Sequence, residues 1–514
     1  MDHRDDRETE QVPVGPPDGA IAAAATTATA ELGDGADHDT RFFGQPWALA
    51  HIFGVEMWER FSFYGMQVVM TYYLYFSVSE GGLGLPQATA LGIIGAYGGT
   101  VYLCTILGAW LADRLLGSER VLFFSAIVIM AGHVALAAIP GFAGVGVGLV
   151  LVALGSGGLK ANATSVVGTL YSAKDPRRDA GFSLFYLGIN LGAFFGPIIT
   201  GAVRDVAGFH WAFLVAAIGM GLGLLQYSFG RTSLPPQSRV IPNPLPRKRY
   251  PVAVGVALVG IAAIAALVLS GIINADNLSA SVAIVTLAAA IAYFAVVLTS
   301  KLITPDERSR VFGFIPLFVT STAFWSLYQQ QFTVVPVYSE SKLDRTIFGL
   351  TMPPEWVQSI NPVFIIVLSG VFAAIWTKLG DRQPSTPVKF GVGTILMGCA
   401  FLLFLPFAGG GENSTPLLAM VGILLVFTVA ELLVSPIGLS VTTKLAPEKV
   451  HTQMVALFFL SVALGTSVSG IVAGYYDAEN EVPYFTILGG LAILVGVGLL
   501  LAVKPVLRLM RGVR

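Results

Sequence analysis

Five ionisable side chains fall inside stretches that are otherwise apolar enough to cross a membrane: Glu56, Glu59, Arg60, Lys160 and Glu431. Placing one charged group inside a bilayer costs about 3 kcal/mol on insertion scales. Charges persist there where they pair with one another or line a water-filled path. The sequence therefore predicts that these five side chains handle protons or a charged solute.

Glu56, Glu59 and Arg60 lie close together in the run Gly54-Val-Glu56-Met-Trp-Glu59-Arg60-Phe-Ser-Phe63-Tyr64-Gly65. On a helix of 3.6 residues per turn they share one face, and Tyr64 and Gln67 continue it. A structural ion pair between helices is the plainer interpretation, but such a pair needs only one acid. The second carboxylate can gain or lose a proton as its surroundings change, which is what coupling to protons requires.

Lys160 follows a run of small residues, Gly155-Ser-Gly-Gly158, that lets a neighbouring helix approach closely. A lysine in this setting needs a carboxylate, and Glu431 in the second half of the chain is the candidate. We expect this pair to close one side of the protein and the protonation of Glu431 to open it. The alternative is that each side chain snorkels or pairs locally.

The elements that hold these residues follow from composition. Of 514 residues only 12% are charged and 54% are apolar, and the mean hydropathy is +0.73, whereas about 25% of a soluble protein is charged. The surface must therefore face lipid, which predicts an all-α polytopic membrane protein. The net charge of −1 gives no basic field for nucleic acid. The two cysteines are too few for a disulfide framework or a zinc cluster, and no nucleotide loop is visible, so we expect neither a metal site nor an enzyme.

Fourteen apolar segments are expected to span the membrane, since each is long enough for the ~20 residues that a bilayer requires. Their approximate limits are 47–76, 87–112, 120–139, 142–170, 180–203, 210–229, 250–272, 280–300, 311–338, 358–378, 388–407, 415–442, 451–474 and 483–503. Nearly all Lys and Arg fall in the two ends and one set of alternate connections, whereas the opposite set holds Arg204, Lys342 and Arg345. Basic residues concentrate in cytoplasmic loops, so both termini are expected to be cytoplasmic.

The expected domains follow the same division. They are a disordered acidic cytoplasmic tail (1–45), a six-helix bundle (46–230), a Pro-rich basic cytoplasmic linker (231–249), an inserted helix hairpin packed outside the working core (250–301), a second six-helix bundle (302–505) and a cytoplasmic tail (506–514). The turns with Asp113-Arg114 and Gly380-Asp381-Arg382 fall at the same place in the two bundles. This pattern resembles the loop motif of the major facilitator superfamily and implies its fold.

Four motifs resemble those of the proton-dependent oligopeptide transporter family. The run from Glu56 to Gly65 is similar to its E-x-x-E-R-F-x-Y-Y-G signature. The other three are Phe185-Tyr186-Leu-Gly-Ile-Asn190-Leu-Gly192, Gln358-Ser-Ile-Asn361-Pro362 and Glu431-Leu-Leu-Val-Ser435-Pro436-Ile-Gly-Leu-Ser440. The resemblance extends from about residue 42 to 503, including the hairpin seen in bacterial members.

The resemblance implies import of di- and tripeptides with protons, by alternating access about a central cavity. Glu56, Glu59, Arg60, Lys160 and Glu431 would couple protons, with Arg60 near the peptide carboxylate and Glu431 near its amino group. The implied substrate-binding residues are Arg60, Tyr64, Tyr102, Lys160, Asn190, Trp325, Gln329, Asn361, Glu431 and Ser435. Taken alone, most of the neutral positions in this set are better explained by a hydrogen bond between helices.

This chain departs from the family at several positions. Gln67 stands where members commonly have Arg, Gln329 where they have Glu, Phe458 where a Trp is common, and Phe63 where the signature has Tyr. In the family the first two groups are thought to pair on the external side. We therefore expect Gln67 and Gln329 to form a neutral amide contact in an external gate, beside the Lys160–Glu431 gate.

The partners expected are short peptides and the lipid bilayer of a bacterial cytoplasmic membrane, with protons as the coupling ion, no other cofactor and a monomeric state. One alternative keeps the fold and carries a peptide-like drug or another small metabolite, since the two Gln substitutions alter the pocket. A second alternative is a membrane sensor that no longer transports. Retention of all five membrane charges argues against the sensor, because a scaffold has no use for an unpaired carboxylate.

Overall fold

The structure is a computed structural model that describes residues 39–172, 175–447 and 451–513. Most of the expected disordered tail, up to residue 38, lies outside these ranges. The helices are α1 (Trp47–Tyr75), α2 (Gln87–Leu111), α3 (Ser118–Ala138), α4 (Gly141–Gly168), α5 (Arg178–Ala207), α6 (Phe209–Gly230), α7 (Tyr250–Leu269), α8 (Leu278–Thr299), α9 (Pro305–Tyr328), α10 (Val334–Ser341), α11 (Ile360–Leu379), α12 (Thr386–Leu402), α13 (Leu417–Leu445), α14 (His451–Ala473), α15 (Glu481–Leu501) and α16 (Val503–Leu509).

The four strands form two short pairs in the loops. β1 (Leu343–Asp344) pairs in parallel with β4 (Thr415–Pro416), and β2 (Thr346–Ile347) pairs antiparallel with β3 (Leu350–Thr351). Thirteen helices within the described ranges are long and apolar enough to cross a membrane. Helix α1, which carries Glu56, Glu59 and Arg60, is not among them, so the count of fourteen spans stays a prediction.

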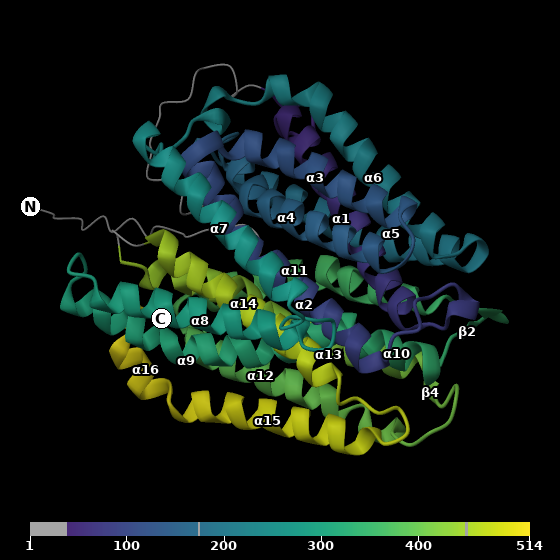
Figure 1. The fold of residues 1–514 in the computed structure, drawn as a ribbon. Coiled ribbons are helices and arrows are strands. Elements are labelled where there is room, and N and C mark those ends of the chain that lie inside the picture. The colour runs from purple at the N-terminus through teal and green to yellow at the C-terminus, as the bar shows by residue number, and fades with distance from the viewer. Residues whose placement is uncertain (1–38, 173–174, 448–450, 514) are drawn as a thin grey trace, which may run out of the picture.

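The helices form two bundles, each with its own apolar core. Helices α1–α6 surround one cluster of buried side chains, and α9–α15 surround a second that also takes in α8. In Figure 1 the first bundle occupies the upper half of the view and the second the lower half. Each core is built mainly from one half of the chain, although Leu91 of α2 belongs to the second core. The two halves therefore form two bundles, which is the arrangement of the major facilitator fold.

The bundles meet along two seams. In the first, α2 packs on α14, where the Cβ of any larger residue at Gly95 would collide with the backbone of Gly470. In the second, α5 packs on α11 and on the 3-10 turn Pro354–Ser359 that precedes it. Glycine at the first seam is required by close backbone approach rather than by backbone conformation.

The expected hairpin consists of two unlike helices. No side chain of α7 is buried, and in Figure 1 this helix crosses the front of the molecule. Helix α8 instead packs against α2 and α14 at the first seam, where Ser279 Oγ donates to the Ser467 carbonyl oxygen at 2.7 Å. Thr89 Oγ1 donates to Asp276 Oδ1 at 2.5 Å, so the turn before α8 is bound to α2.

The expected span 311–338 is interrupted. Helix α9 ends at Tyr328, a 3-10 turn covers Gln329–Phe332, and α10 begins at Val334. Pro336 has no N–H to donate to the carbonyl of Phe332 four residues earlier, which disfavours a continuous helix there. That carbonyl instead accepts from Thr71 Oγ1 of α1 at 3.1 Å, so the break creates a contact between the bundles.

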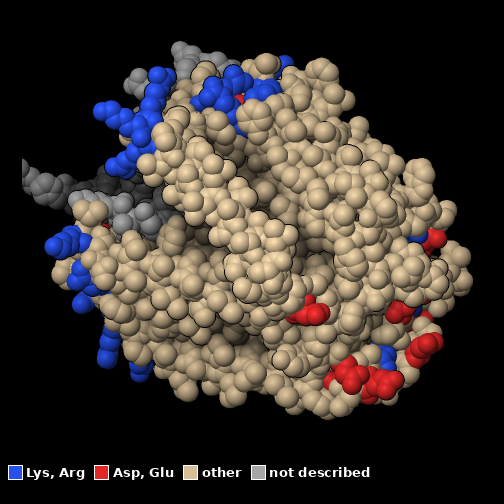
Figure 2. All heavy atoms as spheres, in the orientation of Figure 1, with Lys and Arg blue, Asp and Glu red and all other residues tan. Residues whose placement is uncertain are grey.

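Charges of opposite sign gather at opposite ends of the molecule. Figure 2 shows most Lys and Arg at the left, where α16 and the start of α7 lie in Figure 1, and most Asp and Glu at the right, near β2 and β4. We call these the basic end and the acidic end. Helix α1 runs from the basic end to the acidic end, and α5 does the same.

The linker 231–249 is bound to the first bundle. Arg231 donates to the buried carboxylate of Glu119 at 2.8 and 3.1 Å, and Arg239 Nε lies 3.5 Å from the same group. The Asn243 amide donates to the Asp113 carbonyl oxygen at 3.0 Å. The segment is therefore bound by its arginines to the first turn of α3 and by its backbone to the segment after α2, although its composition predicts only a linker.

Residues 39–45, placed by the sequence in a disordered tail, are also bound to the first bundle. Arg177 donates to the Asp39 carbonyl oxygen at 3.1 Å, and Tyr171 Oη donates to Gln45 Oε1 at 2.9 Å. Hydrogen bonds from Arg41 and the Trp47 amide hold the pKa of Asp39 well below its usual range. Local polar contacts therefore hold residues 39–45 against the first bundle, while the domain boundary at residue 45 stays a prediction.

Candidate functional site

A polar cavity lies between the two bundles. Helices α1, α2, α4 and α5 line it from one side, and α9, α11, α13 and α14 line it from the other, together with the 3-10 turn Gln329–Phe332. All the residues implied for substrate binding or the gate line this cavity, with the exception of Arg60: Tyr64, Gln67, Tyr102, Lys160, Asn190, Trp325, Gln329, Asn361, Glu431 and Ser435. Segments as distant as α1 and α13 thus converge on one space.

Two side chains bring opposite charges to the cavity, one from each bundle. Glu431 of α13 accepts from Tyr328 Oη at 2.8 Å and from Asn361 Nδ2 at 3.4 Å. Lys160 Nζ of α4 lies 4.4 Å from the ring centre of Phe63 and 5.5 Å from that of Tyr102, within the range of cation–π attraction. The expected ion pair between Lys160 and Glu431 stays a prediction, but both groups line the same cavity.

Four buried polar atoms of cavity-lining residues have no hydrogen-bond partner among the described residues. They are Gln67 Oε1, Trp325 Nε1, Gln331 Nε2 and Ser435 Oγ, on residues that are 4%, 6%, 3% and 1% exposed. Buried polar groups in proteins are nearly always hydrogen-bonded, because leaving one unsatisfied costs about 1–3 kcal/mol. The arrangement therefore suits a polar ligand or water that supplies the missing partners.

The acidic cluster of α1 is enclosed inside the first bundle. Arg60 Nε donates to Glu56 Oε1 at 2.8 Å and lies 3.4 Å from Glu59 Oε2. Ser156 Oγ of α4 donates to Glu59 Oε1 at 2.7 Å, whereas Glu59 Oε2 accepts no hydrogen bond from the residues that the structure describes. One guanidinium thus faces two carboxylates, as the spacing predicts.

None of Glu56, Glu59 and Arg60 is among the described residues that line the cavity. All three side chains are at most 1% exposed. Because Arg60 does not line the cavity in this structure, its contact with a peptide carboxylate stays a prediction.

Glycines of α5 determine how close α1 can come. A Cβ at Gly192 would collide with the Met57 carbonyl oxygen, and one at Gly196 with that of Phe61. Because α5 has no side chains at these positions, it packs directly on the backbone of the turn that carries Glu59 and Arg60. This contact explains why the cluster is buried rather than facing the cavity.

The cavity is closed towards the acidic end by contacts between α1 and the interrupted helix. The ring of Tyr64 stacks on that of Phe332, with centroids 5.8 Å apart and an interplanar angle of 22°. Thr71 donates to the Phe332 carbonyl oxygen, and Tyr72 Oη to that of Pro336 at 3.0 Å. Two places on α1 about two turns apart, Tyr64 and the pair Thr71 and Tyr72, therefore contribute to the closure.

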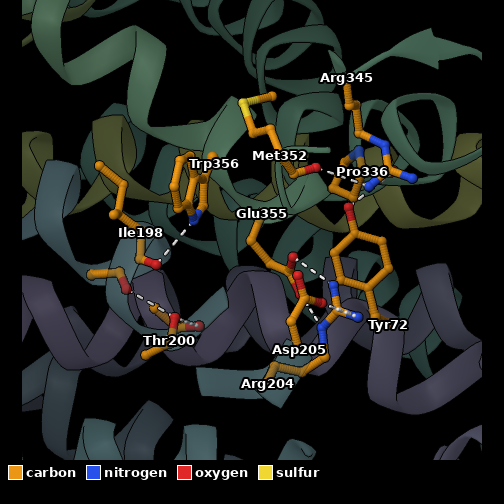
Figure 3. A network of polar contacts seen from close by, with 12 residues as sticks. Tyr72, Ile198, Thr200, Arg204, Asp205, Pro336, Arg345, Met352, Glu355 and Trp356 are labelled. Atoms are coloured by element: carbon orange, nitrogen blue, oxygen red, sulfur yellow. Dashed lines mark hydrogen bonds and ion pairs between the residues drawn. The ribbon is translucent and has the colours of Figure 1, made fainter. Parts of the chain in front are cut away.

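A second set of contacts closes the acidic end between α5 and the turn before α11 (Figure 3). Arg204 Nε and Nη2 donate to the two carboxylate oxygens of Glu355 at 2.7 and 2.8 Å. Glu355 is fully buried and the Arg204 side chain is 14% exposed. Trp356 Nε1 donates at 3.0 Å to the carbonyl oxygen of Ile198, which lies about one and a half turns before Arg204 on α5.

The gate contact expected between Gln67 and Gln329 stays a prediction. No hydrogen bond joins the two amides within the part of the chain that the structure describes. The ion pair between bundles at the acidic end is instead Arg204–Glu355, which sequence reasoning assigned to loops. Arg204 was one of few basic residues expected on that side, and this rarity is the signal that could have marked it.

Two bundles with separate cores, enclosing a cavity that carries one positive and one negative side chain, define a solute carrier of the major facilitator type. The profile of the POT family matches residues 119–488. The chain belongs to the POT family, and it is a transporter and not an enzyme.

Relatives and solved structures agree with this membership. The chain is 42% identical to a di-/tripeptide transporter of Lactococcus lactis subsp. cremoris, covering 92% of this chain and 98% of the relative. It is 34% identical to the peptide transporter YePEPT of Yersinia enterocolitica, covering 91% and 96%. A crystal structure of a peptide transporter POT in complex with sulfate superposes with a TM-score of 0.88 at 41% identity, covering 93% and 98%.

A POT family transporter in complex with 5-aminolevulinic acid is a further structural neighbour. It superposes with a TM-score of 0.85 at 34% identity, covering 91% of this chain and 98% of that chain.

Proposed function

We propose that this chain is a proton-coupled symporter that imports di- and tripeptides by alternating access. The observation that carries the proposal is the placement of Lys160 and Glu431 on opposite sides of one cavity. A peptide at neutral pH carries one carboxylate and one ammonium group, and each forms a strong charge-assisted hydrogen bond with a partner of opposite charge. The relatives named di-/tripeptide transporters support the same substrate class.

In this proposal Glu431 binds the peptide ammonium and Lys160 its carboxylate. The unpartnered atoms of Trp325 and Ser435 then bind polar groups between the two termini. Because the ligand supplies hydrogen bonds that the empty site lacks, the binding free energy comes from groups that every peptide possesses. Side chains of the peptide meet the aromatic walls, which accept many shapes.

Protons are the coupling ion of the proposed cycle, and no other cofactor is required. The two carboxylates that share Arg60 offer one site for an exchangeable proton, and Glu431 offers another. Protonation of Glu431 removes the charge that holds Lys160 or the peptide ammonium. Release of substrate and transfer of the proton would then be linked.

The proposed location is a bacterial cytoplasmic membrane, with the basic end in the cytoplasm and the acidic end outside. The separation of charge in Figure 2 supports this orientation, because Lys and Arg concentrate on the cytoplasmic side. Helix α1 begins and α16 ends at the basic end, which would place both termini in the cytoplasm. A monomer is sufficient, because one chain builds the whole cavity.

A second candidate keeps the fold and the mechanism but carries another small metabolite. The structural neighbour in complex with 5-aminolevulinic acid favours it, since that ligand also has an ammonium and a carboxylate. Lys160 and Glu431 would serve either class of solute. Competition against labelled dialanine separates the two candidates, because only substrates of the same cavity compete.

Uptake into proteoliposomes tests the proposal. Purified protein is reconstituted, and labelled dialanine and trialanine are supplied with and without an inward proton gradient. The expected result is accumulation above equilibrium that a protonophore abolishes. Uptake that merely equilibrates and ignores the gradient would rule out symport, and absence of any peptide uptake or binding would rule out the peptide class.

A further inference from the structure

We propose that Gln67 and Gln329 form a neutral amide subsite at the closed end of the cavity. This subsite would bind an uncharged, hydrogen-bonding side chain of the peptide and disfavour an ionised one. The inference rests on the proposed function, because it specifies which peptides the cavity prefers.

The position of Gln67 follows from its neighbours on α1. Tyr64, Gln67 and Thr71 lie on one face of the helix, three and four residues apart. Tyr64 stacks on Phe332 and Thr71 donates to the Phe332 carbonyl oxygen. Gln67 therefore lies between two of the contacts that close the cavity towards the acidic end.

Gln329 reaches the same place from the other bundle. Gln329 begins the 3-10 turn that ends at Phe332, and Gln329 and Phe332 both line the cavity. Gln67 and Gln329 thus approach one end of the cavity from opposite bundles, at the two positions that were expected to form a gate.

Both side-chain amides have unused hydrogen-bonding capacity. Gln67 Oε1 is buried and has no partner, and the Gln329 side chain makes no hydrogen bond with the described residues. An amide offers two donors and an acceptor with two lone pairs, so these groups are available to a ligand. The pair offers both donors and acceptors, which matches a primary amide or a hydroxyl better than it matches an apolar group.

The closed end is also without charge. Among the described residues that line the cavity, Lys160 and Glu431 carry the charges, whereas Gln67, Gln329, Gln331 and Gln358 are neutral. An ionised side chain placed among these amides would lose its hydration and meet no counter-ion. A glutamine or asparagine side chain would lose less hydration and recover its hydrogen bonds.

Competition with matched peptides tests the subsite. The experiment measures how strongly unlabelled peptides inhibit the uptake of labelled dialanine into proteoliposomes. The inhibitors are Ala-Gln, Ala-Glu and Ala-Met, and the reversed peptides Gln-Ala, Glu-Ala and Met-Ala. Gln and Glu have the same shape and differ in charge, whereas Met keeps the length and removes the amide. Ala-Gln or Gln-Ala should inhibit at a roughly 2- to 10-fold lower concentration than its Met counterpart, and its Glu counterpart should be weaker still.

Substitutions then locate the effect. Gln67→Met should bring the Gln-to-Met ratio close to one. Gln329→Glu should raise the potency of Ala-Lys relative to Ala-Gln, a gain that a misfolded variant cannot produce. Gln87→Met is the matched control, since Gln87 lies outside the cavity and donates to the Tyr476 carbonyl oxygen, and it should leave the ratios unchanged.

Failure of the subsite and failure of the peptide proposal give different results. Normal dialanine uptake in the wild type with equal inhibition by the Gln, Glu and Met peptides in both positions would overturn the subsite alone. A preference for Gln that survives in both Gln67→Met and Gln329→Met would also overturn it. If dialanine is neither bound nor transported, the proposed function itself fails.

Discussion

At the scale of single residues, Arg60 is the centre of the acidic cluster. Its guanidinium lies between Glu56 and Glu59, and Ser156 fixes one oxygen of Glu59 while the other accepts no hydrogen bond from the described residues. Two buried carboxylates sharing one cation cannot both be ionised at low cost. We therefore expect one of the two carboxylates to carry the coupling proton, and a substitution at Glu59 tests whether it is this one.

Glu59→Gln should separate transport from coupling. The amide oxygen can still accept the hydrogen bond that Ser156 donates, but the amide holds no exchangeable proton. Accumulation driven by a proton gradient should therefore be lost. Exchange of labelled for unlabelled dialanine should stay within a few-fold of the wild type, because it needs no net proton movement. Both rates are measured in the same proteoliposomes.

Glu80→Gln is the control for this substitution. Glu80 is exposed at the acidic end and accepts from Ser77, so the variant should accumulate dialanine normally. Gradient-driven accumulation by Glu59→Gln equal to that of the wild type would place the coupling proton elsewhere.

At the scale of elements, two irregular segments close the acidic end. The break in the helix at Gln329–Phe332 frees a carbonyl for Thr71, and the turn Pro354–Ser359 presents Glu355 to Arg204 of α5. Regular helices could not make these contacts, because their own backbone groups are already bonded. Irregular backbone at the closed end of the cavity thus provides the polar contacts that hold the two bundles together there.

Glu355→Gln should open the acidic end. It leaves Arg204 without the carboxylate of the other bundle, and removing one partner of a buried ion pair costs about 3–5 kcal/mol. The cost falls on the closed arrangement alone, so the population should shift away from it. Spin labels at the exposed positions Val78 and Leu418 should then report longer distances between the bundles.

Asp205→Asn is the matched control for the ion pair. Asp205 also contacts Arg204, at 2.8 Å, but lies on the same helix and is 40% exposed. This variant should leave the distance distribution unchanged. Exchange of the two charges, Arg204→Glu with Glu355→Arg, should restore part of the closed population. Identical distributions for Glu355→Gln and the wild type would contradict a gating role.

At the scale of the whole molecule, the separation of charge supports the orientation that we propose for the protein in the membrane. Basic residues surround the end with α16 and the linker, and acidic residues surround the end with the strands (Figure 2). The contact of Glu119 with Arg231 and Arg239 further fixes basic side chains on that end. Membrane insertion retains such charge on the cytoplasmic side.

Labelling of single cysteines tests the orientation. With Cys104 and Cys399 replaced by serine, a membrane-impermeant thiol reagent should label Glu412→Cys in intact cells but should label Arg511→Cys only after the cells are opened. Both positions are exposed, one at each end. The opposite pattern would invert the proposed topology and place the closed end in the cytoplasm.

Much of the site could be predicted from local sequence. The spacing of Glu56 and Arg60 forces them together on any helix, and motif positions led to Trp325, Asn361 and Glu431, which all line the cavity. The contact expected between Gln67 and Gln329 stays a prediction, because both side chains line one cavity but no hydrogen bond joins them among the described residues. The function of the Arg204 side chain could not be inferred from a segment that resembles an ordinary loop.

The sequence by itself determined where the long apolar segments lie and which charges fall within them. Both follow from local properties, since the bilayer acts on each segment through its length and polarity. Only the tertiary structure decided that Arg60 turns into its own bundle, and that Arg204 meets Glu355 from 151 residues away. These outcomes depend on how the two bundles and their helices pack, and no local pattern encodes that packing.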